Sequence, residues 1–190
     1  LLPTGSILTD YTPTFTWKIV LPPAGTTISQ YLIEIDDDPA FGSPVSGTSA
    51  TTSFTPAAPL TSNLKYYWRV RTENNLGELS NWSLVRYFRT ALTPPTLTAP
   101  VEAFASMELR PMFSWQPVDQ ATGYTIQIAK DINFTQIVHT GNPTGEFYTP
   151  TADLPKSTIV PTLYWRVQTK GTNGPSAYSE PRSFTTPSNP

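Results

Sequence analysis

Few residues of this sequence could take part in chemistry, and they are scattered. The chain has 1 His, His139, and 0 Cys, so it offers no thiol nucleophile, no disulfide framework and no pair of imidazoles for a metal ion. Carboxylates such as Glu34 and Asp131 have no evident catalytic partner, and neither a nucleophile elbow nor a phosphate-binding loop is present. We therefore expect no enzymatic activity, no catalytic residues, no cofactor and no metal centre, and we interpret His139 as a surface strand residue.

The only acidic run, Asp36-Asp37-Asp38, could supply oxygen ligands to Ca²⁺. Adjacent residues at the end of a strand point in different directions, so they cannot all face one ion. Pro39 follows at once, and the alternating spacing of a calcium loop is missing. We favour a solvated turn that leads into the next strand, with a weak surface cation site as the alternative.

Arginines and aromatic residues gather around one predicted strand. Arg69 and Arg71 should project from the face opposite Trp68, and Trp82 follows after a turn, within reach of the same sheet. An exposed guanidinium over an indole gains about 0.5–1 kcal/mol. The segment Leu79-Ser80-Asn81-Trp82-Ser83 resembles half of the Trp-Ser-x-Trp-Ser element of cytokine receptors, in which arginine and tryptophan side chains interleave.

A fainter copy of this pattern, Arg166 with Tyr178-Ser179, occurs later in the chain. We interpret both as structural stacking. A receptor-like ligand surface is the alternative, but cytokine receptors carry disulfides in their first domain and a chain with 0 Cys cannot form them. Cytokine recognition is therefore disfavoured.

Outward-facing aromatic side chains could instead stack on sugar rings, because they are flat and apolar with polar edges. They also shield sheet faces and support cross-strand pairing, so packing is the favoured interpretation and carbohydrate contact the alternative. Two N-glycosylation sequons, at Asn81 and Asn133, would mark surface positions in a host that glycosylates. The possible ligand-contact aromatics are Tyr67, Trp82, Tyr164 and Tyr178, and Tyr87 is a further candidate.

The composition narrows the class of protein. There are 21 Pro among 190 residues, roughly twice the usual share, and long helices do not survive that density. The 12 Lys+Arg and 14 Asp+Glu leave a net charge of −2, which gives no electrostatic reason to bind nucleic acid. No apolar stretch approaches the roughly 18 residues of a membrane span. We expect a β-rich protein located outside the cell or on its surface.

The sequence contains an internal repeat. The run Tyr67-Trp68-Arg69-Val70 returns as Tyr164-Trp165-Arg166-Val167, and further blocks return in the same order. Among these, Pro13-Thr14-Phe15-Thr16-Trp17 matches Pro111-Met112-Phe113-Ser114-Trp115. Such conservation of order within one chain indicates two homologous domains.

Within each repeat the apolar residues alternate with a period of two, as in half-buried antiparallel strands. Tyr31, Ile33 and Ile35 share one face of a predicted strand. About seven short strands separated by Gly, Pro and Asn turns predict a sandwich of two sheets in each repeat. The fold class is therefore all-β, two tandem seven-stranded immunoglobulin-like sandwiches, with a core that includes Phe15, Trp17, Trp68, Phe113, Trp115 and Trp165.

The boundary between the repeats should lie within residues 90–100, where proline and threonine crowd together. Such a segment prefers extended polyproline geometry and acts as a short, semi-rigid spacer that contributes to the first strand of the second domain. We place the domains at 1–92 and 93–190. Both ends of the chain suggest further protein on either side.

Each repeat resembles a fibronectin type III domain, of the kind found in secreted or surface multidomain bacterial proteins. The early Phe-x-Trp strand, the Tyr-x-Ile-x-Ile strand, the Tyr66-x-Trp68-x-Val70-x-Thr72 strand and the Asn74-Asn75-Leu76-Gly77 turn carry the resemblance. The family's tyrosine corner falls on Tyr66, whereas its counterpart in the second repeat is Leu163.

We therefore expect a non-catalytic spacer, adhesion or assembly module of a larger secreted or cell-surface protein. One alternative is a carbohydrate-binding accessory module of a polysaccharide-active enzyme, and another is a segment of a surface-layer or filament subunit. The expected partners are neighbouring domains of a longer chain, with surface polysaccharide or copies of the chain itself as further candidates.

Overall fold

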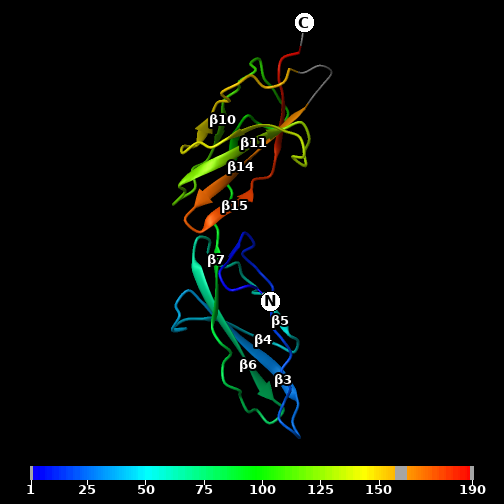
Figure 1. Cartoon of the computed structure of the whole chain (residues 1–190), viewed down its shortest axis with the longest axis vertical. Coiled ribbons are helices and arrows are strands. Elements are labelled where there is room, and N and C mark those ends of the chain that lie inside the picture. The colour runs from blue at the N-terminus through cyan, green and yellow to red at the C-terminus, as the bar shows by residue number, and fades with distance from the viewer. Residues whose placement is uncertain (1, 157–161, 189–190) are drawn as a thin grey trace. The chain divides into compact units, whose positions relative to one another are not determined.

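The computed structural model describes residues 2–156 and 162–188, and every regular element in these ranges is a strand. The chain divides into two compact units, Leu1–Ala91 and Leu92–Pro190. The predicted all-β fold of two tandem sandwiches is confirmed (Figure 1). Across the described residues, no helix has the length and apolar character needed to cross a membrane.

The first domain pairs a five-stranded sheet with a two-stranded one. The large sheet has the order β1-β7-β6-β3-β4, and β2 pairs with β5 in the other sheet. The neighbours are antiparallel except β1 and β7, which run parallel. The strands are β1 (Ser6–Leu8), β2 (Phe15–Thr16), β3 (Ile28–Asp36), β4 (Val45–Ser49), β5 (Ser53–Phe54), β6 (Lys65–Asn74) and β7 (Arg86–Thr90).

The core of the first domain follows from the alternation along β3 and β6. Every second residue of β6 is buried, so Trp68 at 3% exposure faces inward while Arg69 and Arg71 face outward. Phe15 lies edge-on to Trp68, with ring centroids 5.2 Å apart. Trp17 is half-buried and packs against this core beside Tyr31.

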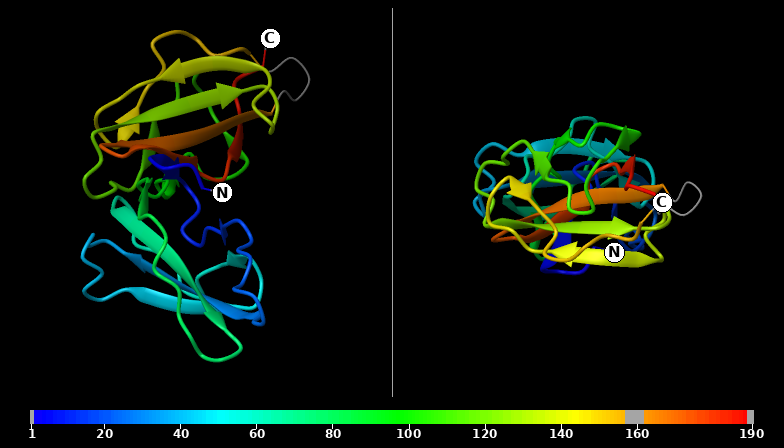
Figure 2. Two further views of the ribbon diagram at one scale, coloured as in Figure 1. Left: turned by 60° about the horizontal axis from the view of Figure 1, so that its bottom comes forward. Right: turned by 90° about the horizontal axis from the view of Figure 1, so that it is seen from above.

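The second domain repeats this arrangement, except that its first strand and its last strand are each split into two shorter strands. One sheet has the order β13-β10-β8, and the other has the order β12-β11-β14-β16-β9, with β15 pairing to β14. Figure 2 shows the strands of both domains from two further directions. The strands are β8 (Leu97–Ala99), β9 (Phe104–Ala105), β10 (Phe113–Trp115), β11 (Gly123–Ala129), β12 (Ile137–Gly141), β13 (Phe147–Tyr148), β14 (Leu163–Gly171), β15 (Gly174–Tyr178) and β16 (Arg182–Thr185).

Aromatic side chains fill the centre of the second domain. Phe113 and Trp165 are both fully buried, with ring centroids 5.0 Å apart. Trp115 is 2% exposed and lies edge-on to Tyr124. The inward positions of β14 therefore match those of β6, as the repeat predicts.

A glycine at the same place in each domain lets an aromatic ring cross between the sheets. A Cβ at Gly47 would lie 2.1 Å from the ring of Phe54, and one at Gly141 would lie 2.3 Å from the ring of Tyr148. Only a residue without a side chain fits under these rings.

The segment predicted to be a spacer belongs largely to folded structure. The Ala91 amide donates to Leu8 O within the first domain, and Thr93 O accepts from Thr169 Oγ1 within the second. Residues 97–99 form β8, and the Ala99-Pro100 peptide bond is cis.

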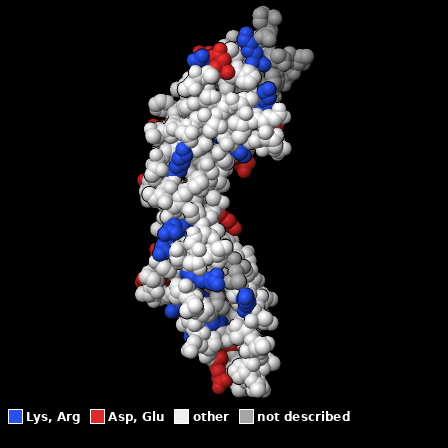
Figure 3. Space-filling model, viewed as in Figure 1, with Lys and Arg blue, Asp and Glu red and all other residues white. Residues whose placement is uncertain are grey.

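Charged side chains are scattered over the face shown in Figure 3, and neither sign forms one large patch there.

Candidate functional site

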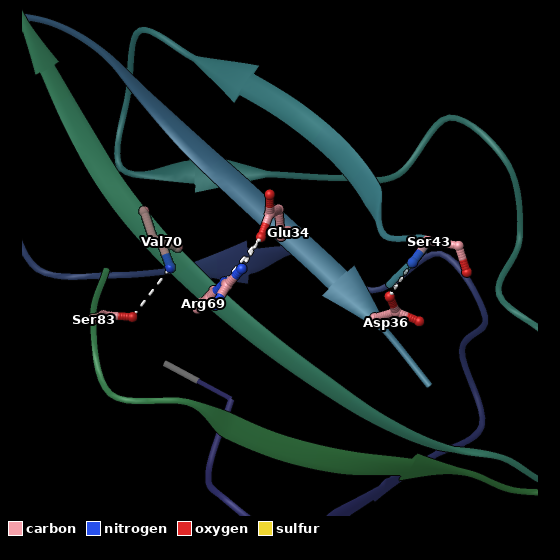
Figure 4. A network of polar contacts seen from close by, with 6 residues as sticks. All are labelled: Glu34, Asp36, Ser43, Arg69, Val70 and Ser83. Carbon is pink, nitrogen blue, oxygen red and sulfur yellow. Dashed lines mark hydrogen bonds and ion pairs between the residues drawn. The ribbon is translucent and has the colours of Figure 1, made fainter. Parts of the chain in front are cut away.

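The outward arginines of the first domain are stacked on aromatic rings. The Arg69 guanidinium lies 4.0 Å from the ring centroid of Phe41 and 4.5 Å from that of Trp82. Arg71 lies 4.3 Å from the same Trp82 ring. Arg69 also forms an ion pair of 2.7 Å with Glu34 on β3 (Figure 4). We call Phe41, Arg69, Trp82 and Arg71 the first stack.

Two serines hold Trp82 in this position. Ser83 Oγ accepts the Val70 amide at 3.1 Å, as Figure 4 shows, and Ser80 Oγ accepts the Thr72 amide at 3.0 Å. The amides of Ser80 and Ser83 in turn donate to the carbonyls of Thr72 and Val70. The segment that carries Trp82 is thus bonded to β6 at both ends.

The turn after β3 places Phe41 on the other side of Arg69. The Phe41 amide donates to Asp38 O, and Phe41 has a left-handed φ of 56°. Left-handed backbone is costly for a large side chain, so the rest of the turn has to hold it.

The carboxylate of Asp36 supplies part of that support. Asp36 is 4% exposed, and its oxygens accept the amide of Asp38 at 3.2 Å and that of Ser43 at 3.0 Å, the second of which is drawn in Figure 4. Burial by itself would raise the pKa of Asp36, but the hydrogen bonds from Asp38, Ser43 and Asp37 together outweigh it and hold the pKa below its usual value.

The acidic run therefore forms a hydrogen-bonded turn. Asp38 Oδ1 also accepts an amide, that of Ala40, at 2.9 Å. Within residues 2–156 and 162–188, no group of three His, Cys, Asp or Glu side chains is placed to hold a metal ion.

The second domain contains a copy of the stack. The Arg166 guanidinium lies 3.9 Å from the ring of Phe134 and 4.0 Å from that of Tyr178. Gln127 takes the place of Glu34, and its Oε1 accepts from Arg166 at 2.8 and 3.1 Å. Burial lowers the pKa of Arg166, with Tyr178 opposing the shift. We call Phe134, Arg166 and Tyr178 the second stack.

The elements that support the second stack also match the first. Ser176 Oγ and Ser179 Oγ accept the amides of Thr169 and Val167 on β14. Phe134 has a φ of 57°, and its amide donates to Asp131 O. The Asp131 carboxylate accepts the amides of Thr135, Gln136 and Asn133, which lower its pKa.

The remaining candidate aromatics lie outside the stacks. Lys65 Nζ lies 4.7 Å from the ring of Tyr67 and 4.4 Å from that of Tyr87, so these two tyrosines share one cation. Tyr164 is half-buried on β14, opposite Ala129 and Ser183 on the neighbouring strands. Trp82 and Tyr178 therefore belong to the stacks of their own domains, whereas Tyr67 and Tyr164 do not.

Sequence reasoning missed Phe41 and Phe134, which complete the stacks. A signal was present, because Asp38-Pro39-Ala40-Phe41 and Asp131-Ile132-Asn133-Phe134 share an Asp-x-x-Phe pattern at matching places of the repeat.

His139 lies on β12, half-buried, with its Nε2 2.7 Å from the hydroxyl of Tyr148. Burial lowers the pKa of His139.

Two grooves mark the surface of the first domain. A shallow one of about 300 Å³ lies beside Trp82 and Arg71 and is lined further by Leu32, Ile33, Glu34, Ser46, Gly47 and Thr48. A larger one of about 620 Å³, which we call the open groove, has mainly apolar walls that include Trp17, Trp68, Val70 and Leu84. Sequence reasoning predicted neither groove.

These features define the class of protein: tandem β-sandwich domains of the fibronectin type III and immunoglobulin-like kind. Residues 3–94, which span the first domain, match the family described as the Rha78A-like N-terminal immunoglobulin domain. A search of the curated proteins found no match.

Solved structures with a similar arrangement come from proteins of different kinds. The α-L-rhamnosidase of Streptomyces avermitilis, solved with L-rhamnose, is 16% identical with a TM-score of 0.40 over 94% of this chain and 23% of its own. A two-domain fibronectin type III segment of chicken tenascin is 14% identical with a TM-score of 0.44, covering 94% of each chain. The FN1–FN3 domains of chicken CNTN1 are 16% identical with a TM-score of 0.38, over 94% of this chain and 63% of theirs.

Proposed function

We propose that this chain is a non-catalytic structural module, a spacer or assembly segment of a longer secreted or cell-surface polypeptide. The observation that carries the proposal is the duplication of the stacks. Arg69 with Trp82 and Arg166 with Tyr178 are the outward groups best suited to grip a ligand, yet each pair is engaged within its own domain. A contact that two divergent repeats build in the same way serves the sandwich they share.

The match to a family of N-terminal domains supports a place for this module beside other domains of a longer chain. The first domain is similar to an immunoglobulin domain that stands at the N-terminus of Rha78A-like proteins. A tandem sandwich at that position would hold a neighbouring catalytic or surface domain in place without taking part in catalysis.

A domain exchange in the parent protein tests the structural role. If the module acts as a spacer, an unrelated fibronectin type III pair should restore the parent's function after deletion of this chain. A flexible Gly/Ser linker should not, because it fixes no distance. Restoration by neither replacement would contradict the spacer role and indicate that specific residues of this chain are needed.

A second candidate function is carbohydrate binding at the shallow groove beside Trp82. There an aromatic ring lies next to the polar side chains of Glu34, Ser46 and Thr48, a combination that suits the apolar face and hydroxyl edge of a sugar ring.

Retention of the purified chain on insoluble polysaccharides and cell-wall material tests this candidate. Ser46→Arg would fill the groove without removing any member of the first stack, and Thr140→Arg at the matching position of β12 is the control. Retention lost only in Ser46→Arg would establish carbohydrate binding. Absence of retention on every matrix would remove this candidate and leave the structural one.

A further inference from the structure

Arg71 differs from the other two stacked arginines because no side chain accepts its hydrogen bonds. Arg69 donates to Glu34, and Arg166 donates to Gln127. The Arg71 side chain forms no hydrogen bond or ion pair with any residue that the structure describes, and its buried Nε has no partner there. Buried donors in proteins are usually paired, so the surroundings of Arg71 lack an acceptor.

The stacking of Arg71 leaves its N–H donors unused. Its guanidinium lies 4.3 Å from the ring centroid of Trp82, and such a contact uses the flat face of the guanidinium, whereas the five donors lie in its plane. Glu73, the next outward residue of β6, accepts from Gln30 at 2.7 Å and forms no ion pair with Arg71. A carboxylate can accept from two donors of a guanidinium at once.

The second domain carries an uncharged side chain at the same place. Arg71 lies opposite Leu32 and Gln168 lies opposite Thr125, and each follows the stacked arginine of its own strand by two positions. Gln168 Nε2 donates to Ser176 O at 2.6 Å, so this side chain is bonded within its domain. The unpaired cation therefore belongs to the first domain alone and is not part of the shared scaffold.

Arg71 lies in a row of side chains that crosses the outer face of the large sheet. In the order β4-β3-β6, Thr48 lies opposite Leu32, and Leu32 lies opposite Arg71. The row beside it places Ser46 opposite Glu34. These five residues all line the shallow groove. Neighbouring strands are about 4.8 Å apart, so a ring placed over Leu32 lies between Thr48 and Arg71.

The groove combines an apolar floor with a hydroxyl rim. Leu32 is half-buried with Trp82 beside it, and together they suit the C–H face of a sugar ring. Ser46 and Thr48 are exposed, and their hydroxyls have no hydrogen-bond partner in the part of the chain that the structure describes. They are therefore available to the hydroxyl groups of a ligand.

The charge left uncompensated in this groove is positive. Arg69 Nη2 lies 2.7 Å from Glu34 Oε2, so these two charges offset each other. Apart from Glu34 and Arg71, the residues that line the groove are uncharged. A neutral sugar would offer Arg71 only neutral acceptors, whereas an acidic sugar supplies the stronger, charge-assisted hydrogen bond.

We propose that the shallow groove binds an acidic sugar, a uronate residue of a polysaccharide, whose carboxylate pairs with Arg71. The apolar face of the sugar ring lies over Leu32 beside Trp82, and its hydroxyls meet those of Ser46 and Thr48 on β4. The proposal rests on the carbohydrate-binding candidate given above, and it narrows the ligand from sugars in general to sugars that carry a carboxylate.

An NMR titration of the whole chain with a galacturonic acid tetrasaccharide tests this proposal. The matched ligand is the same tetrasaccharide with its carboxylates methyl-esterified, which keeps the rings and removes the charge. We expect the acid form to shift the signals of the Trp82 indole and of the Ser46 and Thr48 amides, with an affinity about tenfold higher than that of the ester. Added salt should reduce this preference, because it screens the charges.

Arg71→Gln tests the contact itself. The second domain has Gln168 at the matching position, so the sandwich should tolerate this substitution. The affinity for the acid form should fall to that for the ester. Arg89→Gln, which removes a positive charge from β7 instead, should leave both affinities unchanged.

Three results would overturn the proposal. Equal affinities for the two forms, unaltered in Arg71→Gln but lost in Ser46→Arg, would do so and leave the carbohydrate-binding candidate standing. No shift with either form would also do so, and the retention on polysaccharides described above decides whether that candidate falls as well. Stronger shifts of the same signals by a glutamate-rich peptide, lost in Arg71→Gln, would assign the groove to a protein partner instead of a sugar.

Discussion

The two domains share one scaffold, and only in the second does the structure describe a strand along the seam between the sheets. In the second domain Leu97 and its neighbours lie along β10 and Arg182 holds their carbonyls. In the first domain the matching walls line a groove of about 620 Å³. The inward faces of the long strands thus build equivalent cores in both domains, and a described strand along the seam adds Leu97 to the core of the second.

The largest expected effect concerns the two core tryptophans. Trp165→Ala should cost about 3–5 kcal/mol, because Trp165 is fully buried and its removal leaves a closed cavity. Trp68→Ala should cost less, because Trp68 already lines the open groove and its removal extends existing surface. Urea unfolding followed by NMR signals of each domain measures both losses. Equal losses would contradict the difference between the domains.

Truncating the buried leucine of β8 should lower the stability of the second domain alone. Leu97→Ala should destabilise the second domain by about 2–5 kcal/mol, since a buried leucine of β8 is truncated. The first domain is the internal control, because its unfolding should not change. The same urea titration provides the measurement, and a loss below about 0.5 kcal/mol would show that β8 contributes little to closure.

The stacks should contribute similarly in both domains. Arg166→Ala removes contacts to two rings and the hydrogen bonds to Gln127, and should cost about 1–2 kcal/mol. Arg69→Ala removes the matching contacts in the first domain, and its ion pair with the half-exposed Glu34 adds only about 0.2–1 kcal/mol. Calorimetry of the two variants measures the effect. An unchanged melting temperature in both would argue against a structural role for the stacks.

Acid should weaken the first domain through Asp36. Its pKa in the folded protein is lowered, so its stabilising effect is present above the unfolded value of about 3.9 and is lost as the pH falls through the folded value. Asp36→Asn should remove this part of the pH dependence and lower the stability at pH 7. Unfolding free energies measured from pH 7 to pH 2 test this, with Asp10→Asn as an exposed control in the same domain.

The smallest effect should come from His139, whose folded pKa is lowered by burial. The unfolded chain then binds the proton more readily, so the second domain should lose stability as the pH falls below about 6.5, until the folded pKa is passed. The first domain has Val45 at the matching position of β4 and should show no such change. His139→Gln should remove the slope, and a persistent slope would assign it to another group.

Much of the fold could be predicted from particular residues. The alternation through Trp68 and Val70 identified inward and outward faces, and placed Arg69 and Arg71 together on the outer face with Trp82. Such faces follow from the period of a strand, which is local. The roles of Phe41 and Phe134 were not predicted, because left-handed turns bring each ring against an arginine that is distant in the sequence.

The contacts of the predicted ligand-contact aromatics also could not be read from the sequence. The sequence identified Tyr67, Trp82, Tyr164 and Tyr178 as outward-facing, but which cation each would meet depended on the packing of neighbouring strands. Asp36 looked like part of a solvated acidic run, yet its carboxylate is buried and accepts backbone amides.

By itself the sequence determined two tandem sandwiches, their repeated cores and the arginine-aromatic pattern, because apolar alternation and internal repetition act over a few residues at a time. The tertiary structure decided which strand edges find partners, as where β8 pairs with β10, and which aromatic rings meet each arginine. Strand pairing and ring stacking join residues that are distant in the sequence, so the local pattern of one strand does not determine them.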